Sequence, residues 1–399
     1  MRGLHFARIA GIDVYIDWSL LIVFLLIAGS LAGGLFPLWH PEWTAAQSWM
    51  TALAAAVLFF GSVLAHELSH ALVGRRHGIT IRRITLFVFG GMAHMEHEPE
   101  KWRAELWMAA VGPVTSLVIG FACLLAVDVF GGSDRPQGPV GPQEARQMLA
   151  QLGPASTLLL WLGQVNIILA AFNLVPGFPL DGGRVLRAIL WGITGNLRRA
   201  THWASLCGQV FAWVLIVTGL AMILGLRVPL LGGGLISGLW LAFIGWFLNN
   251  AALMSYRQLL TREALQDVPV SRLMLTRFDM VPPDMSIATL IDDHIMRTGQ
   301  RAFPVVSGNR LIGMVCLHDV NKVEAARRAT TTVADIMTPA DQVRSVRPDD
   351  EVFEALTALA ERNVNQLPVL VDGRVHGLVR REDIVRWLAL HGGGRTMPV

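Results

Sequence analysis

Charged residues are scarce in this chain of 399 residues. Asp, Glu, Lys and Arg together make up 16% of it, whereas a soluble globular protein carries about a quarter. Hydrophobic residues reach 53%, and the mean hydropathy is +0.48. This composition excludes an ordinary soluble enzyme and a disordered chain, and it favours a membrane protein with a smaller polar part.

Cysteine is also rare, since the chain has only Cys123, Cys207 and Cys316. None of them belongs to a Cys-x-x-Cys pair, so the sequence predicts neither a disulfide framework nor a thiolate metal site. Any metal ion must therefore be held by His and carboxylate side chains. The N-terminus shows no cleavable signal pattern, and no nucleic-acid motif accompanies the basic residues.

Long apolar runs fill most of the chain before residue 255. Six of them are long enough to cross a bilayer, which takes about 20 apolar residues. They lie roughly at 18–36, 49–73, 105–130, 155–172, 204–225 and 233–254. The sequence therefore predicts a polytopic α-helical membrane protein with about six transmembrane helices.

Basic residues are divided unevenly between the two sets of segments that flank these runs. The set that includes both ends of the membrane part holds 14 Lys and Arg residues, and the other set holds 3. Because cytoplasmic segments carry the excess of Lys and Arg, we expect both termini to be cytoplasmic. Six spans return the chain to its starting side, so the span count and the charges agree.

Two segments alternate apolar and polar residues, as strands do: 11–17 and part of 79–89. Unpaired strand edges are costly next to lipid, so we expect these strands to pair with each other or to pack against protein. They would form a small membrane-associated β-sheet at the cytoplasmic face.

The polar tail contains an internal repeat, over 267–323 and 333–388. Each copy has a Pro-Asp step, an amphipathic helix, a strand with Pro-Val, and a Gly-led strand that runs into an acidic residue. Two such copies indicate a pair of α/β domains and not a solenoid. We expect a membrane domain over 1–255, a linker over 256–266, and two tail domains over 267–325 and 332–390.

The second apolar run contains the motif His66-Glu67-Leu68-Ser69-His70. Residues at i and i+4 lie one turn apart on the same helix face, so the two His can bind one metal ion with Glu67 beside it as a general base. Titratable residues inside an apolar span are costly and are functional by default. The alternative is a polar cluster hydrogen-bonded between helices, but the spacing favours a metal site.

A catalytic zinc site needs a third protein ligand and an open position for water. The best candidate is Asp181, because Pro176 and Pro179 break any helix before it and Gly182 and Gly183 allow a close backbone approach. Broken backbone at membrane depth is tolerated only where it is buried in protein or lines a cavity. The alternative is that Asp181 simply caps the helix that follows.

Together these motifs resemble the site-2 protease family of intramembrane zinc metalloproteases. The His-Glu-x-x-His motif lies in a span, and Asn-x-x-Pro-x-x-Pro-Leu-Asp-Gly follows about 110 residues later. Gly90–Ala93 resembles the membrane-associated hairpin of that family, and Ala110–Pro113 resembles its third-span Gly-Pro element. The tail resembles a pair of CBS domains, which one branch of the family carries.

The resemblance implies one catalytic zinc ion held by His66, His70 and Asp181, with Glu67 as the catalytic base. It makes Asn173 a candidate for positioning the scissile carbonyl, although a helix-end cap explains this residue equally well. The implied reaction is hydrolysis of peptide bonds within the transmembrane segment of a substrate. Since the motif lies near the cytoplasmic end of its span, we expect cleavage in the cytoplasmic half of the bilayer.

CBS pairs usually bind adenine nucleotides between their two units, and the resemblance assigns the ribose contacts to Asp319 and Asp383. The Ser or Thr expected three residues earlier is replaced by Cys316 in one unit and Arg380 in the other, so a hydroxyl is missing in both. Two interpretations therefore stay open. The tail is either a nucleotide-binding regulatory module or a dimerisation module without a ligand.

The resemblance suggests a single-span substrate, such as an anti-sigma factor, and a homodimer formed through the CBS domains. It places the protein in the plasma (inner) membrane of a bacterium or archaeon, as a multi-pass protein with both termini cytoplasmic. A CBS-regulated transporter and a non-catalytic membrane scaffold are the alternatives. Neither of them requires a His-Glu-x-x-His motif paired with Leu180-Asp181-Gly182.

Overall fold

The computed structural model describes residues 3–391 except 89, 96–98, 131–140, 229–231 and 309. The chain forms two compact units, Met1–Tyr256 and Arg257–Val399. The first unit is helical with one small sheet, and the second combines short strands and helices. Each unit has its own buried clusters of apolar side chains.

Six helical segments in the described ranges are long and apolar enough to cross a membrane, which confirms the predicted number. The first is built from α1 and α2 joined by a π-helical turn, η1. The bounds are α1 Trp18–Ser30, η1 Leu31–Leu35, α2 Phe36–Trp39, α3 Ala45–Arg76, α4 Trp102–Phe130, α6 Pro154–Asn173, α8 Leu197–Ile223 and α9 Leu235–Leu265. The described part of the first unit has two shorter helices as well, α5 Pro142–Gln151 and α7 Asp181–Thr194.

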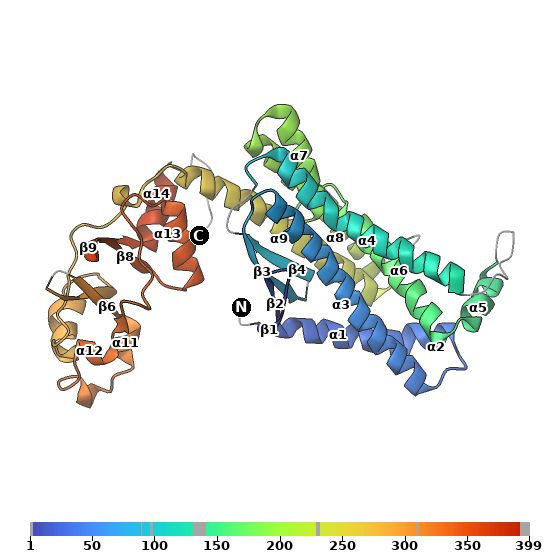
Figure 1. The fold of residues 1–399 in the computed structure, drawn as a ribbon, viewed down its shortest axis with the longest axis horizontal. Coiled ribbons are helices and arrows are strands. Elements are labelled where there is room, and N and C mark those ends of the chain that lie inside the picture. Colours follow the sequence, from blue (N-terminus) through green and yellow to red (C-terminus); the bar gives the residue numbers. More distant parts are fainter. Residues whose placement is uncertain are drawn as a thin grey trace. The chain divides into compact units, whose positions relative to one another are not determined.

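Helices α3, α4 and α6 pack side by side (Figure 1). Small residues let the backbones approach closely, as is usual between transmembrane helices. A Cβ atom added at Gly120 of α4 would lie 3.0 Å from the carbonyl oxygen of Gly163 of α6, and one added at Gly163 would lie 3.0 Å from that of Gly120. The same kind of approach joins α8 and α9 at Gly219 and Gly238.

A four-stranded sheet lies beside these helices in the first unit (Figure 1). Its strands, in sheet order, are β1 Leu4–Ile9, β2 Ile12–Ile16, β3 Ile81–Phe87 and β4 Gly90–Met95. The predicted pairing of the two segments is confirmed, because β2 pairs in parallel with β3. Residue 89 of the predicted segment is outside the described residues.

The sheet is attached to α3 by apolar side chains. Ile12, Ile81 and Ile84 are almost completely buried and belong to one cluster with Val63 and Ala71 of α3. In the last turn of α3, the guanidinium of Arg75 donates hydrogen bonds to backbone carbonyls of both β-hairpins. These contacts fix β4, the edge strand next to β3, relative to the helix that carries the His-Glu-x-x-His motif.

The second unit repeats one α/β pattern, as the tail sequence predicts. The first copy pairs β5 Ala302–Ser307 with β6 Arg310–Cys316, and the second pairs β8 Gln366–Val371 with β9 Arg374–Arg380. Two apolar clusters form, one around Phe303 and one around Leu359, and each includes the opening segment of the other copy: Val333 packs with Phe303, and Val270 packs with Leu359. The remaining elements are η2 Val270–Arg272, α10 Ile287–Thr289, η3 Leu290–Ile295, α11 Leu317–Asn321, η4 Ala325–Arg327, α12 Val333–Ile336, β7 Thr338–Pro339, α13 Val352–Glu361 and α14 Arg381–His391.

Candidate metal centre

Helix α3 presents the two His side chains of the motif on one face. The helix begins with a capping box, in which the Thr44 hydroxyl accepts a hydrogen bond from the backbone N–H of Gln47 and the Gln47 side chain returns to the Thr44 N–H. It ends with Arg75 and Arg76 in its last turn, where cations are favourable. His66 and His70 are buried, with 4% and 9% of their surface exposed.

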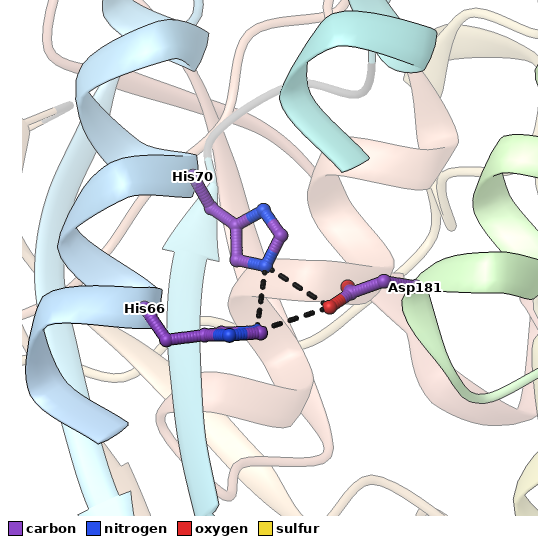
Figure 2. Close-up of side chains that lie close together, drawn as sticks. All are labelled: His66, His70 and Asp181. Carbon is purple, nitrogen blue, oxygen red and sulfur yellow. Dashed lines mark hydrogen bonds and ion pairs between the residues drawn. The ribbon is translucent and has the colours of Figure 1, made fainter. Parts of the chain in front are cut away.

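Three donor atoms converge at this point (Figure 2). The Nε2 atom of His66 lies 3.1 Å from Nε2 of His70, and each lies 3.1 Å from Oδ2 of Asp181. Asp181 is 111 residues beyond His70 in the chain. Among the described residues, these three make up a group of His and carboxylate side chains that could hold a metal ion.

The donor set fits a zinc ion. Zinc takes His nitrogen and carboxylate oxygen at about 2.0–2.1 Å in a tetrahedron, which puts its ligand atoms about 3.3 Å apart. The observed separations of 3.1 Å are close to that value. Three protein donors also leave a fourth position for water, as in catalytic zinc sites.

The outer nitrogens of both imidazoles are hydrogen-bonded to α4. His70 Nδ1 donates to the carbonyl oxygen of Met108, which leaves its Nε2 free of a proton and able to bind a metal. His66 Nδ1 lies 2.9 Å from the hydroxyl of Ser116, which is completely buried. These contacts orient the two rings toward one point, as outer-shell partners of metal ligands do.

Ser116 and the role of Gly112 beside the two His residues were not predicted from the sequence. Met108, Gly112 and Ser116 recur every four residues and therefore share one face of α4. Gly112 must be small, because an added Cβ atom would lie 2.2 Å from His70 Nε2 and 2.6 Å from His66 Nε2. The signal available in the sequence was a small and a polar residue, Gly112 and Ser116, one helical turn apart in an apolar span.

Asp181 is brought to the His residues by a tightly packed loop, 174–180. A Cβ atom added at Gly182 or Gly183 would lie 2.4 Å from backbone atoms of this loop, and the same holds for Gly177 against α8. Asp181 is the first residue of α7, and the N-cap position belongs to Leu180. The interpretation of Asp181 as a simple helix cap is therefore wrong, because its carboxylate faces the two imidazoles.

Glu67 and Asn173 lie outside the trio of donors. Glu67 follows His66 on α3 and is half-buried. Its side chain contacts β4, where a Cβ atom added at Gly91 would lie 2.2 Å from Glu67 Cγ. Asn173 is the last residue of α6 and is half-buried, and no hydrogen bond between described residues joins it to the trio.

The two acidic residues predicted in the tail have different surroundings. Asp319 lines a cavity of about 720 Å³ in the second unit, together with Cys316 and four residues that carry or can carry positive charge, Arg301, His318, Arg344 and Arg362. Its Oδ2 accepts hydrogen bonds from the Cys316 backbone N–H and thiol at 3.2 and 2.9 Å. Burial by itself would raise the pKa of Asp319, but the hydrogen bonds from Cys316 and Lys322 outweigh it and hold the pKa below its usual value.

Asp383 is engaged by the residue that replaces the expected hydroxyl. Arg380 donates two hydrogen bonds to its carboxylate, at 2.6 and 2.8 Å, and forms a further ion pair with Glu382 at 2.6 Å. The hydrogen bond to Asp383 raises the pKa of Arg380, so this pair stays charged. A planar guanidinium thus occupies both oxygens that would meet a ribose.

Known proteins are similar to nearly the whole chain. Peptidase family M50 matches residues 54–216, and the CBS domain matches residues 270–325 and 333–390. Rip3 of Mycobacterium tuberculosis, which is named as a zinc metalloprotease, is 32% identical over 96% of this chain and 92% of its own length. A Synechocystis protein named as the zinc metalloprotease sll0528 is 32% identical over 97% and 96%. The solved site-2 protease of Methanocaldococcus jannaschii is 25% identical, with a TM-score of 0.40, and covers 64% of this chain and 96% of its own.

Proposed function

The chain belongs to peptidase family M50, the site-2 zinc metalloproteases, and we propose that it is an intramembrane endopeptidase. It also carries tandem CBS domains. Its reaction is the hydrolysis of peptide bonds within transmembrane segments of other membrane proteins. The observation that carries the proposal is the convergence of His66, His70 and Asp181 among helical segments, six of them in the described part of the chain, that are long and apolar enough to cross a membrane. Neither the transporter nor the scaffold alternative needs this cluster.

In the proposed reaction, His66, His70 and Asp181 hold the zinc ion. When bound, zinc activates a water molecule and polarises the carbonyl of the scissile bond. Glu67, next to His66 on α3, accepts the proton of the attacking water and delivers it to the leaving amine. Met108 and Ser116 keep the imidazoles in orientation through their hydrogen bonds.

The substrate must present an extended backbone, because a helix hides its carbonyl groups. Strand β4 is an edge strand, and its Gly91 lies against Glu67. We therefore assign β4 as the strand on which the substrate segment pairs, by β-augmentation. Asn173, at the end of α6 close in sequence to Asp181, is assigned to the scissile carbonyl, and this assignment rests on the family motif alone.

The cellular setting follows from charge and family. The 14 to 3 division of Lys and Arg supports cytoplasmic termini, and the family supports the plasma (inner) membrane of a bacterium or archaeon. We assign single-span regulatory proteins, such as an anti-sigma factor, as the substrate class. Cleavage then takes place in the cytoplasmic half of the bilayer.

The CBS pair is the regulatory part of this proposal, and it takes an adenine nucleotide at one of its two acidic positions. Asp319 lines a cavity with several cationic side chains, which suits a ribose followed by phosphates. Asp383 is held by Arg380 and is unsuited to the same task. The nucleotide regulates cleavage only if it binds the active and inactive states with different affinity.

The decisive experiment uses the purified full-length protein in liposomes with a single-span test substrate. Cleavage by wild type is expected to disappear in Glu67→Gln and after chelation, because the first lacks the base and the second lacks the metal. Glu42→Gln is the matched control, since Glu42 is exposed and lies outside the spans. Cleavage that persists in Glu67→Gln would contradict the proposed base, and wild type without zinc would favour the transporter or scaffold.

A further inference from the structure

A buried ion pair joins α4 and α7 outside the trio of donors. The guanidinium of Arg187 donates from Nε to Oε1 of Glu105 at 2.6 Å, and its Nη2 contacts the same oxygen. Glu105 is 1% exposed and Arg187 is 6% exposed.

Such a pair is not explained by stability alone. Removing two charges from water costs several kcal/mol per ion, and the cost is offset only when the geometry of the pair is good. Apolar side chains of similar volume would often stabilise a fold equally well or better. A charged pair inside a membrane protein therefore calls for a role that apolar packing does not supply.

The two helices that the pair joins carry the two halves of the metal centre. Helix α4 holds both imidazoles, through the carbonyl of Met108 and the hydroxyl of Ser116. Glu105 is three residues before Met108 and lies on the same face of α4. Helix α7 carries Asp181 as its first residue, and Arg187 follows six residues later.

Arg187 also contacts the loop that precedes Asp181. Its guanidinium carbon lies 5.2 Å from the centre of the Phe178 ring, within the range of a cation–π contact. Phe178 is 6% exposed and lies three residues before Asp181. The Arg187 side chain thus links α7 to α4 through Glu105 and links the loop 174–180 to α7 through Phe178. Phe178 precedes Asp181 in the chain and Arg187 follows it.

We propose that Glu105 and Arg187 are positioning residues that set the Asp181 carboxylate against His66 and His70 and thereby determine the metal affinity of the centre. The proposal rests on the proposed zinc site. Its mechanism is geometric, since metal ligands must be placed within about 0.2 Å of their ideal distances. Outer partners of metal ligands typically contribute 10–100-fold in metal affinity or activity.

The test measures the zinc affinity of the full-length protein in detergent by competition with a chromophoric chelator. In parallel, thermal unfolding of the metal-free protein is measured. The double variant Glu105→Gln/Arg187→Met leaves no unpaired charge. We expect its zinc affinity to fall at least tenfold while the unfolding midpoint of the metal-free protein stays near that of wild type. Zinc affinity within twofold of wild type would overturn the proposal.

Arg187→Lys decides the question if the double variant does not fold, because lysine keeps the charge but lacks the planar fork and the stacking on Phe178. It is expected to bind zinc more weakly than wild type, and wild-type affinity would overturn the proposal. Arg199→Gln, at an exposed position of α8, is the matched control. If the wild-type protein binds no zinc, or if Asp181→Asn binds zinc as tightly as wild type, the proposed zinc site is wrong. If zinc affinity is unchanged only in the Glu105 and Arg187 variants, the zinc site stands and the positioning role is wrong.

Discussion

Gly112 on α4 gives the sharpest test of the metal centre. We predict that Gly112→Ala abolishes zinc binding, because the added methyl group would lie 2.2 Å from His70 Nε2 and 2.6 Å from His66 Nε2. Non-bonded carbon contacts are about 3.5 Å or longer, so the imidazole of His70 must move by about 1.3 Å. That displacement is several times the roughly 0.2 Å that metal–ligand distances allow.

The expected effect is a loss of at least about 100-fold in both zinc affinity and peptide cleavage, since misplacing a reacting group by about 1 Å costs on that order. The assay is chelator competition on the purified full-length protein, followed by cleavage of the test substrate. Moving α4 away does not avoid the loss, because the hydrogen bonds that join the two imidazoles to the Met108 carbonyl and the Ser116 hydroxyl would then break.

The matched control is Gly61→Ala. Gly61 lies on α3, the helix that carries the motif, and a Cβ atom there meets nothing within 4 Å. Alanine is favoured over glycine in a helix interior by about 1 kcal/mol, so this variant should fold and bind zinc as wild type does. The reasoning is refuted if Gly112→Ala keeps wild-type zinc affinity, or if Gly61→Ala loses as much.

Other substitutions test neighbouring parts of the structure. Ser116→Ala should lower zinc affinity about tenfold in the chelator assay, through loss of an outer hydrogen bond; unchanged affinity would make that contact incidental. Gly91→Ala should lower kcat with zinc content unchanged, because it displaces Glu67 and no metal donor; lost zinc would contradict this. Asp319→Asn should remove adenine-nucleotide binding in calorimetry while Asp383→Asn leaves it, and the reverse result would exclude the assigned cavity. Because the folded-state pKa of Asp319 is lowered, its carboxylate stabilises the fold above its unfolded pKa, so in thermal melts Asp319→Asn and wild type should differ at pH 7 and converge as pH falls below about 4.

Several elements of this protein are predicted by short stretches of sequence. Apolar runs of spanning length predict the six crossing segments, because the bilayer demands about 20 apolar residues from each. Alternating residues predict strands β2 and β3 but not β1, and the repeat in the tail predicts two similar α/β copies. His66, Glu67 and His70 could be read from spacing on one helix, since a helical face is a local property.

The residues that meet this helix face come from distant parts of the chain and depend on how the helices pack. Asp181 lies 111 residues beyond His70 in the chain, and the tightly packed loop 174–180 brings its carboxylate to the two imidazoles of α3. The contribution of α4, through Gly112 and Ser116, depends on which of its faces turns toward α3. Hydrophobic periodicity does not specify that choice in a helix that is apolar all round.

The same reason explains the pair of Arg187 and Glu105, whereas Arg380 and Asp383 are only three residues apart in the chain. Arg187 and Glu105 belong to different helices, and their pairing depends on helix packing that no local pattern encodes. In the tail, the sequence showed that Arg380 replaces a hydroxyl, but only the structure showed that its guanidinium holds Asp383 while Asp319 faces a cavity. Composition and spacing are properties of the chain, whereas a site is made by side chains that folding brings within hydrogen-bond distance.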